Sequence, residues 1–302
     1  MKLLIFLKIN LVNLYKIIHS IIQNILKNLG RAYPRFFIFL TPKKLLDYYL
    51  KNDLSTHHIN GYLKTIIISA KSKLYDNLSD QEKEEYCINQ WRTNKGIEWF
   101  EKDLRDHKID EIISERDVII NHLEEFTKAN PKFDVICEIG TGDGRFLSML
   151  ENRFIIFKKL LGVDLNEEFI SRNNIVYKNV EKLYFKSGQI SQIFEKVVDY
   201  AEDSPLLLIS VRTLTWFTQT EIERLFFSMA QSKKHIVIAF SEQNEMDLDK
   251  EIKSFIRSDI FFHSHNYPFL IKKAGLRIFK KIIKFNNKRT NDHQITIFAS
   301  NQ

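Results

Sequence analysis

The chain has 302 residues, of which 44% are hydrophobic and 27% charged, the balance of a soluble globular protein with a full hydrophobic core. Nine glycines and five prolines are too few for long flexible linkers. The first 50 residues hold eight Lys or Arg and one acid, so they carry the whole net charge of +7, and residues 51–302 balance at 37 basic and 37 acidic. This distribution disfavours a nucleic-acid partner, because a protein that binds nucleic acid needs a basic stripe across its binding surface.

Residues 1–30 predict an amphipathic helix that ends at Gly30. Lysines interrupt the apolar run and no small-residue cleavage site follows, which disfavours a membrane span or a signal peptide. The apolar side of the helix consists of Leu11, Leu14, Tyr15, Ile18, Ile21, Ile22, Ile25, Leu26 and Leu29. Lysines on the opposite side suit peripheral contact with an anionic surface, such as the inner membrane face. Alternatively, the apolar stripe packs on the protein's own core or across a dimer.

Residues 31–130 predict a helical cap region, because apolar residues keep helical spacing until Asn130-Pro131 breaks the pattern. Tyr86, Trp91 and Trp99 are spaced like aromatic residues of a helical lid, or else they belong to the core. The two cysteines, Cys87 and Cys137, have no metal-ligand spacing, so we expect reduced thiols in a cytoplasmic protein.

Residues 131–302 predict a third region, in which short apolar runs alternate with amphipathic stretches. Strands are predicted at 133–139, 160–164, 183–186, 206–211, 235–240, 276–285 and 294–299. Helices are predicted at 144–151, 167–175, 190–201 and 220–230. Alternating strands and helices indicate an α/β fold with a parallel sheet covered on both faces. The last two strands are joined too closely for a crossover helix, so the final strand should be antiparallel.

The strongest motif is VICEIGTGDGRFL at 135–147, a buried strand that runs into Gly140, Gly142 and Gly144 and then into a helix. Glycines let the chain turn tightly and admit a ligand against bare backbone, and the helix N-terminus presents free N–H groups. Asp164 ends the next strand, where a carboxylate can accept both ribose hydroxyls of a nucleoside. The G-x-G-x-G spacing differs from the G-x-G-x-x-G of dinucleotide enzymes, and it suits S-adenosyl-L-methionine (SAM), which has no pyrophosphate.

The segment EIGTGDG at 138–144 resembles the first motif of class I SAM-dependent methyltransferases, and the resemblance covers about residues 133–299. It implies a seven-stranded Rossmann-like sheet, mostly parallel with the last strand antiparallel, and SAM as cofactor. The glycines would line the methionine side of SAM, Leu165 would pack on the adenine, and Gln189 would replace the family's acid beside the adenine amino group. The implied cofactor-binding residues are Glu138, Gly140, Thr141, Gly142, Gly144, Asp164, Leu165 and Gln189.

Methyl transfer requires orientation and exclusion of water, and an oxygen nucleophile must also lose a proton. The fourth strand ends in Ser210-Val-Arg-Thr213 without a carboxylate, so no catechol-type metal site is expected. Arg212 is a candidate clamp for an anionic substrate, unless it pairs with a nearby acid.

The segment His265-Asn-Tyr267-Pro resembles a loop of some family members that act on small molecules or sugars. His265 is the candidate base, and Tyr267 is a second candidate catalytic residue, whose ring would also wall the pocket. Alternatively, His265 caps the helix that follows. We expect His263, His293 and the pair His57-His58 to face solvent.

Together these patterns predict a SAM-dependent methyltransferase that acts on the oxygen of a small-molecule or glycan-type acceptor. The alternatives are a lipid or quinone methyltransferase at the membrane face, or a SAM-binding protein without turnover. The oligomeric state stays open.

Overall fold

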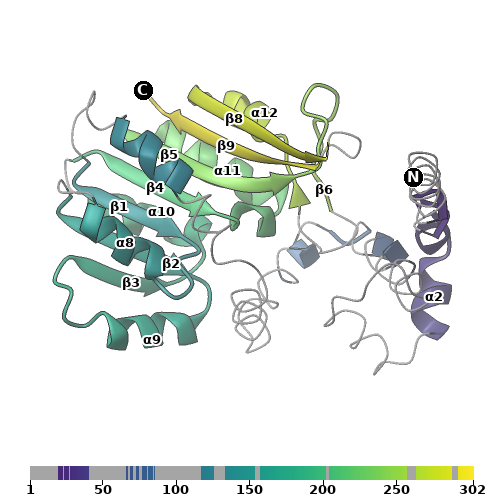
Figure 1. The fold of residues 1–302 in the computed structure, drawn as a ribbon, viewed down its shortest axis with the longest axis horizontal. Helices are drawn as coiled ribbons and strands as arrows, with labels where there is room; N and C mark the ends of the chain where they lie inside the picture. The colour runs from purple at the N-terminus through teal and green to yellow at the C-terminus, as the bar shows by residue number, and fades with distance from the viewer. Residues whose placement is uncertain are drawn as a thin grey trace, which may run out of the picture. The chain divides into compact units, whose positions relative to one another are not determined.

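The computed structural model describes residues 20–22, 24–26, 28–40, 66, 69–70, 73–74, 77–79, 81–83, 85, 117–125, 133–153, 157–201, 204–256, 263–287 and 292–302. The chain divides into two compact units (Figure 1). The first comprises Met1–Ser79 and Ile256–Phe262, and the second comprises Asp80–Phe255 and His263–Gln302. The boundaries predicted after residues 30 and 130 stay predictions.

In the first unit, Gly30 does not end a helix, so that prediction is wrong. Residues 28–32 are all helical, and α2 (Pro34–Leu40) begins with a proline after a bend at Tyr33. A Cβ atom on Gly30 would lie 2.3 Å from the carbonyl oxygen of Ile66 and 2.9 Å from the Cβ of Ser69. The glycine therefore permits a close backbone approach within this unit rather than a turn.

The second unit is built on a seven-stranded sheet with the order β3-β2-β1-β4-β5-β9-β8 (Figure 1). Its strands are β1 (Val135–Ile139), β2 (Lys159–Asp164), β3 (Leu183–Ser187), β4 (Leu206–Val211), β5 (Ile236–Asn244), β8 (Arg277–Asn287) and β9 (Asp292–Ser300). Strand β9 is antiparallel to both of its neighbours, and the other six strands share one direction. The predicted Rossmann-like sheet with an antiparallel last strand is confirmed.

Helices cover both faces of this sheet. The parallel strands require this cover, because their side chains are apolar on both faces of the sheet. The helices are α8 (Arg145–Arg153), α9 (Glu167–Val176), α10 (Ile190–Tyr200), α11 (Gln219–Gln231) and α12 (Tyr267–Ala274), with a 3-10 turn η1 (Leu214–Trp216). One core cluster packs α10, α11 and α12 on one face, and the other packs α8, α9 and the helix at 117–125 on the opposite face. The short strands β6 (Phe255–Ile256) and β7 (His263–Ser264) pair separately.

Strand β5 continues to Asn244, four residues beyond its predicted end at Phe240. The added residues are polar, yet Ser241, Glu242 and Asn244 are fully buried. Pairing with β9 extends along the whole of β5, from Val237 to Asn244, and this pairing carries the polar segment into the interior. The extension places a buried carboxylate at the carboxyl end of the sheet.

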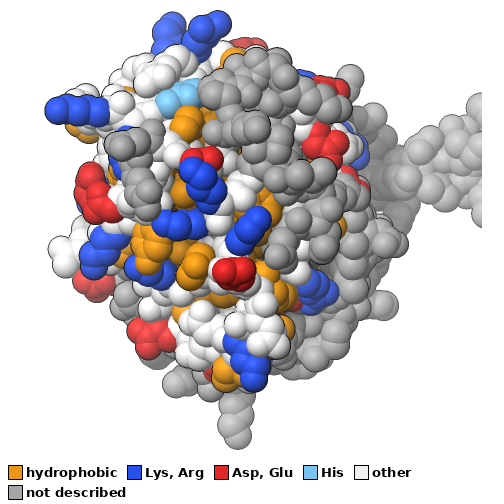
Figure 2. Space-filling model, turned by 90° about the vertical axis from the view of Figure 1, so that its left-hand side faces the viewer, with side chains coloured by type: hydrophobic (Ala, Val, Ile, Leu, Met, Phe, Trp, Pro, Cys, Tyr) orange, Lys and Arg blue, Asp and Glu red, His pale blue; other side chains and the backbone are white. Residues whose placement is uncertain are grey.

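The parallel strands begin at the edge near the C-terminus and end at the opposite edge (Figure 1). Figure 2 views the molecule from the edge at which they begin. On this face Lys and Arg side chains are interspersed with Asp, Glu and apolar groups. The predicted cofactor-binding residues lie toward the other edge, in the last residues of the strands or just after them, where open parallel sheets bind ligands.

Candidate functional site

The glycine loop after β1 has the backbone geometry that a close-approaching ligand requires. Gly140, Gly142 and Gly144 have φ values of 73°, 51° and 73°, the left-handed region that glycine adopts without a steric penalty. The N–H groups of Gly140 and Thr141 donate to the Val163 carbonyl at 2.8 and 3.1 Å, which ties the loop to β2.

Asp164 meets this loop directly, although 22 residues separate it from Gly142. Its Oδ2 accepts the Gly142 N–H at 2.9 Å, and its Oδ1 accepts the Asn166 N–H at 2.9 Å. Each carboxylate oxygen has a further lone pair, so both can still accept hydroxyl groups. Burial raises the pKa of Asp164, while hydrogen bonds from the backbone of Asn166, Gly142 and Leu165 oppose that rise.

Side chains beneath and beside the loop hold it in place. Glu138 is buried in β1, and its Oε2 accepts the Thr141 hydroxyl at 2.9 Å. From α9, the Asn173 amide donates to the Gly142 carbonyl at 2.7 Å, and the Tyr177 hydroxyl lies 3.2 Å from the Asp143 carbonyl. Sequence reasoning missed Asn173 and Tyr177, because nothing in an amphipathic helix indicates which side chains reach a distant loop.

The residues expected at the adenine end follow β2 and β3. Leu165 is half-buried next to Asp164, so part of its side chain is accessible. Gln189 is buried at the start of α10, and its Nε2 donates to the Glu221 carboxylate. A carboxylate only accepts hydrogen bonds, so this contact orients the Gln189 amide with its nitrogen toward Glu221.

Arg212 is the only non-glycine residue with a positive φ, 55°, in the part of the chain that the structure describes. It is half-buried at the end of β4, the place predicted for a substrate clamp. The following residue, Thr213, packs on the glycine loop: a Cβ atom on Gly140 would lie 2.1 Å from the Thr213 Oγ1. Neither Thr213 nor its partner Glu242 was predicted from the sequence.

Both ring nitrogens of His265 are hydrogen bonded inside the protein. Its Nε2 lies 3.0 Å from the Phe217 carbonyl, which only accepts, so Nε2 carries the proton. Its Nδ1 lies 2.6 Å from the Ser254 hydroxyl and therefore accepts. Burial, and then the neighbouring His263, place the pKa of His265 well below its usual value, so the ring is neutral.

The cap of α12 is Asn266, not His265. The Asn266 side chain accepts the Phe269 N–H at 3.0 Å, and its Nδ2 donates to the carbonyls of Leu248 and Glu251. Tyr267 is fully buried, with its ring 4.9 Å from that of Phe240, and its hydroxyl has no hydrogen bond among the described residues. Burial, and then Glu242, raise the pKa of Tyr267 well above its usual value.

The expectation that His263 and His293 face solvent is wrong. They are 5% and 2% exposed, because β7 and β9 carry them into the interior. The His263 ring stacks on His265 at 5.4 Å, and the His293 ring lies 5.4 Å from Phe285. The remaining sequence candidates lie outside the described residues: His57, His58, Tyr86, Cys87, Trp91 and Trp99.

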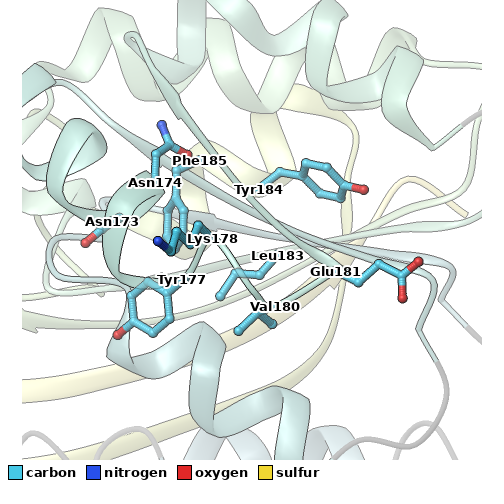
Figure 3. A pocket seen from close by; sticks show the side chains of 9 residues that line it. All are labelled: Asn173, Asn174, Tyr177, Lys178, Val180, Glu181, Leu183, Tyr184 and Phe185. Atoms are coloured by element: carbon cyan, nitrogen blue, oxygen red, sulfur yellow. The ribbon is translucent and has the colours of Figure 1, made fainter.

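A cavity of about 160 Å³ lies between α9 and β3 (Figure 3). Three of its walls, Asn173, Tyr177 and Phe185, also contact the glycine loop. Its volume is below the roughly 300–1,000 Å³ of pockets for cofactor-sized ligands. We therefore do not assign the cofactor to this cavity. Within the described ranges, no group of three His, Cys, Asp or Glu side chains is placed to bind a metal ion.

No protein-family model matches the sequence, and no curated protein gives a significant match. Solved structures of low identity are similar to the chain. A SAM-dependent methyltransferase from Clostridium acetobutylicum ATCC 824 is 15% identical, over 68% of this chain and 97% of that one, with a TM-score of 0.45. The N-methyltransferase NodS from Bradyrhizobium japonicum WM9 is 14% identical, over 64% and 97%, with a TM-score of 0.43. Geranyl diphosphate C-methyltransferase from Streptomyces coelicolor A3(2) is 12% identical, over 63% and 82%, with a TM-score of 0.42.

Proposed function

We propose that the protein is a class I SAM-dependent methyltransferase. The observation that carries the proposal is the 2.9 Å hydrogen bond between the Gly142 N–H and Asp164, which joins a left-handed glycine loop to the acid that ends β2. A bare backbone beside a carboxylate suits a nucleoside whose ribose hydroxyls donate hydrogen bonds. When bound, SAM supplies an electrophilic methyl group on a sulfonium.

The chain's own residues have distinct roles in this proposal. Gly140, Gly142 and Gly144 line the methionine side, and Glu138 orders that side through Thr141. Asp164 accepts the ribose hydroxyls. Beyond it, Leu165 packs on the adenine, and the Gln189 carbonyl oxygen, oriented by Glu221, accepts from the adenine amino group.

Isothermal titration calorimetry with SAM, S-adenosylhomocysteine and NAD tests the cofactor. We expect binding of the first two only. Asp164→Ala removes charge-assisted hydrogen bonds worth about 1.5–3 kcal/mol each, so SAM affinity should fall at least about tenfold. Asp143→Ala is the matched control in the same loop, because its carboxylate pairs with Arg145. Binding of NAD without SAM would overturn the proposal.

For the acceptor, we propose the oxygen of a small-molecule or glycan-type compound, with Arg212 as a clamp for an anionic group. His265 supports this side of the site as a positioning residue rather than as a base, because both of its nitrogens are engaged. Methyl-labelled SAM incubated with cell extract distinguishes the candidates. Label in a polar, glycan-containing fraction supports the proposal, label in organic extract supports a lipid or quinone acceptor, and binding without S-adenosylhomocysteine release indicates a non-catalytic protein.

We also propose peripheral membrane contact through the N-terminal segment. Ile21, Ile25, Leu29 and Tyr33 follow each other at four-residue spacing in the first unit, and they are 54%, 53%, 40% and 61% exposed. The surrounding sequence holds the whole net positive charge, and each basic residue adds about 1 kcal/mol near anionic lipid. No helix within the described residues has the length and apolarity to cross a bilayer.

Flotation with vesicles of phosphatidylcholine, with and without phosphatidylglycerol, tests this contact. We expect binding only to the anionic vesicles, weakened by salt. Replacement of Ile21 and Ile25 by Ser should abolish it, whereas replacement of the exposed Asn24 by Ser should not. Equal flotation of all variants, or a dimer lost in the Ile variant, would show that the stripe has another role.

A further inference from the structure

We propose that Glu242 is a positioning residue for the cofactor loop: its buried carboxylate holds the turn after β4, and this turn clamps the glycine loop through Thr213. The inference rests on the proposed SAM-binding function and adds to it a residue outside the cofactor motif. Glu242 belongs to the polar extension of β5, at the carboxyl end of the sheet.

A single carboxylate oxygen gathers the donors of this turn. The Glu242 Oε1 lies 2.9 Å from the Leu214 N–H and 3.1 Å from the Thr213 N–H. The Ser210 hydroxyl is 3.4 Å away. Glu242 is 0% exposed. Burial of a carboxylate is costly unless hydrogen bonds compensate it, and these three donors to Oε1 belong to the segment that ends β4 and begins η1.

The backbone of the same turn is strained. Arg212 adopts a φ of 55°, which a side chain with a Cβ atom rarely adopts. Such a conformation persists only where the surroundings enforce it. Strand β5 does so at and after the strained residue, because the Ser241 carbonyl accepts the Arg212 N–H at 2.9 Å and Glu242 binds the two following N–H groups.

The turn presses directly on the cofactor loop. Replacing a hydrogen of Gly140 by a Cβ atom would bring that atom to 2.1, 2.4 and 2.8 Å from the Oγ1, Cγ2 and Cβ of Thr213. The Thr213 side chain thus fills the space beside the first left-handed glycine. A displacement of the turn removes the wall against which Gly140 is packed, and the loop loses its preorganisation for the ligand.

Asn244 provides a matched control on the same strand. It is also fully buried and also binds backbone groups: its Nδ2 donates to the His265 carbonyl at 2.7 Å, and its Oδ1 accepts the Met246 N–H at 2.9 Å. Those groups belong to the segment after β5 and to the residues between β7 and α12, not to the turn after β4. If Glu242 acts only as a buried structural group, the two residues should respond alike to substitution.

The experiment compares Glu242→Gln, Glu242→Leu, Thr213→Ala and Asn244→Leu in the full chain. Amide hydrogen exchange is measured first without ligand, and SAM titration follows.

Glu242→Gln keeps an oxygen acceptor, so it should retain SAM affinity within about threefold. Glu242→Leu should accelerate exchange at 212–214 and at 138–144 and weaken SAM binding by about tenfold or more. Thr213→Ala should accelerate exchange at 138–144 alone, and it serves if Glu242→Leu does not fold. Asn244→Leu should accelerate exchange at 245–248 and leave 138–144 unchanged.

Unchanged exchange at 138–144 in both Glu242→Leu and Thr213→Ala would overturn the positioning role, and so would an equal increase in Asn244→Leu. Failure of the wild-type protein to bind SAM would instead overturn the proposed function. The comparison of exchange rates without ligand would still decide whether Glu242 holds the loop.

Discussion

Asp164 is a half-buried carboxyl group, and its protonation couples the candidate site to pH. Burial raises its pKa more than the surrounding backbone N–H groups lower it. Because the pKa in the folded state is raised, the protonated form favours folding, and this contribution to the free energy of unfolding is lost as pH rises through the raised pKa. Ligand binding has the opposite dependence, since only the carboxylate accepts both ribose hydroxyls.

We therefore expect SAM affinity to increase as pH rises through an interval above the usual pKa of an aspartate. Calorimetric titration across this range measures the dependence, and Asp164→Asn is the control, because its amide does not titrate. An equal slope in the wild-type protein and in Asp164→Asn would assign the pH dependence to another group.

Replacement of tyrosine by phenylalanine should have different effects on the free energy of unfolding at Tyr267 and at Tyr177. The Tyr267 hydroxyl is buried without a hydrogen bond among the described residues, so Tyr267→Phe should leave the free energy of unfolding unchanged or raise it by about 1 kcal/mol. The Tyr177 hydroxyl bonds to the Asp143 carbonyl, so Tyr177→Phe should cost about 0.5–1.5 kcal/mol. Urea denaturation of both variants measures the two differences. A clear loss of stability in Tyr267→Phe would indicate a buried partner for its hydroxyl.

At the scale of elements, alanine substitutions at two glycines test the contact between the glycine loop and the turn after β4. Gly140 and Gly275 both have positive φ, 73° and 86°, so alanine at either position should cost about 1–2 kcal/mol in backbone strain. Gly275 ends α12 with nothing within 4 Å of its would-be Cβ, whereas Gly140 faces Thr213. Gly140→Ala should therefore lower the melting temperature more than Gly275→Ala and should also weaken SAM binding.

A double variant separates the steric clash between residue 140 and Thr213 from the backbone strain of alanine at position 140. Thr213→Gly in the Gly140→Ala background should restore part of the lost stability, because it removes the three side-chain atoms nearest to the new Cβ. Additive losses in the double variant would mean that the two positions do not interact.

At the scale of the molecule, the proposed cofactor residues all belong to the second unit and come from the ends of several strands. Bound SAM should therefore slow amide exchange at 138–144, 164–166 and 187–189 together. The helical residues 28–40 of the first unit should show no change. Hydrogen exchange with and without saturating SAM gives this map, and protection confined to 28–40 would be incompatible with the proposed site.

The sequence alone determined the α/β class, the positions of all seven sheet strands to within a few residues and the glycine loop with its acid. Local patterns were sufficient there, because strand burial, helix periodicity and left-handed turns are properties of neighbouring residues. Predictions from the sequence failed where distant segments decide the outcome. Gly30 closely approaches another segment, and the polar end of β5 is part of the strand because β9 pairs along it. His263 and His293 were expected to face solvent, but both are buried.

Only the tertiary structure decided which polar groups meet. Glu242 and Thr213 are 29 residues apart, and Gly142 and Asp164 are 22 apart, so their contacts depend on strand order rather than on spacing. The same holds for His265, whose two hydrogen bonds reach Ser254 and Phe217 from different segments. A sequence reports which side chains are able to bind a ligand or move a proton, but burial and partners in space determine whether they are already engaged.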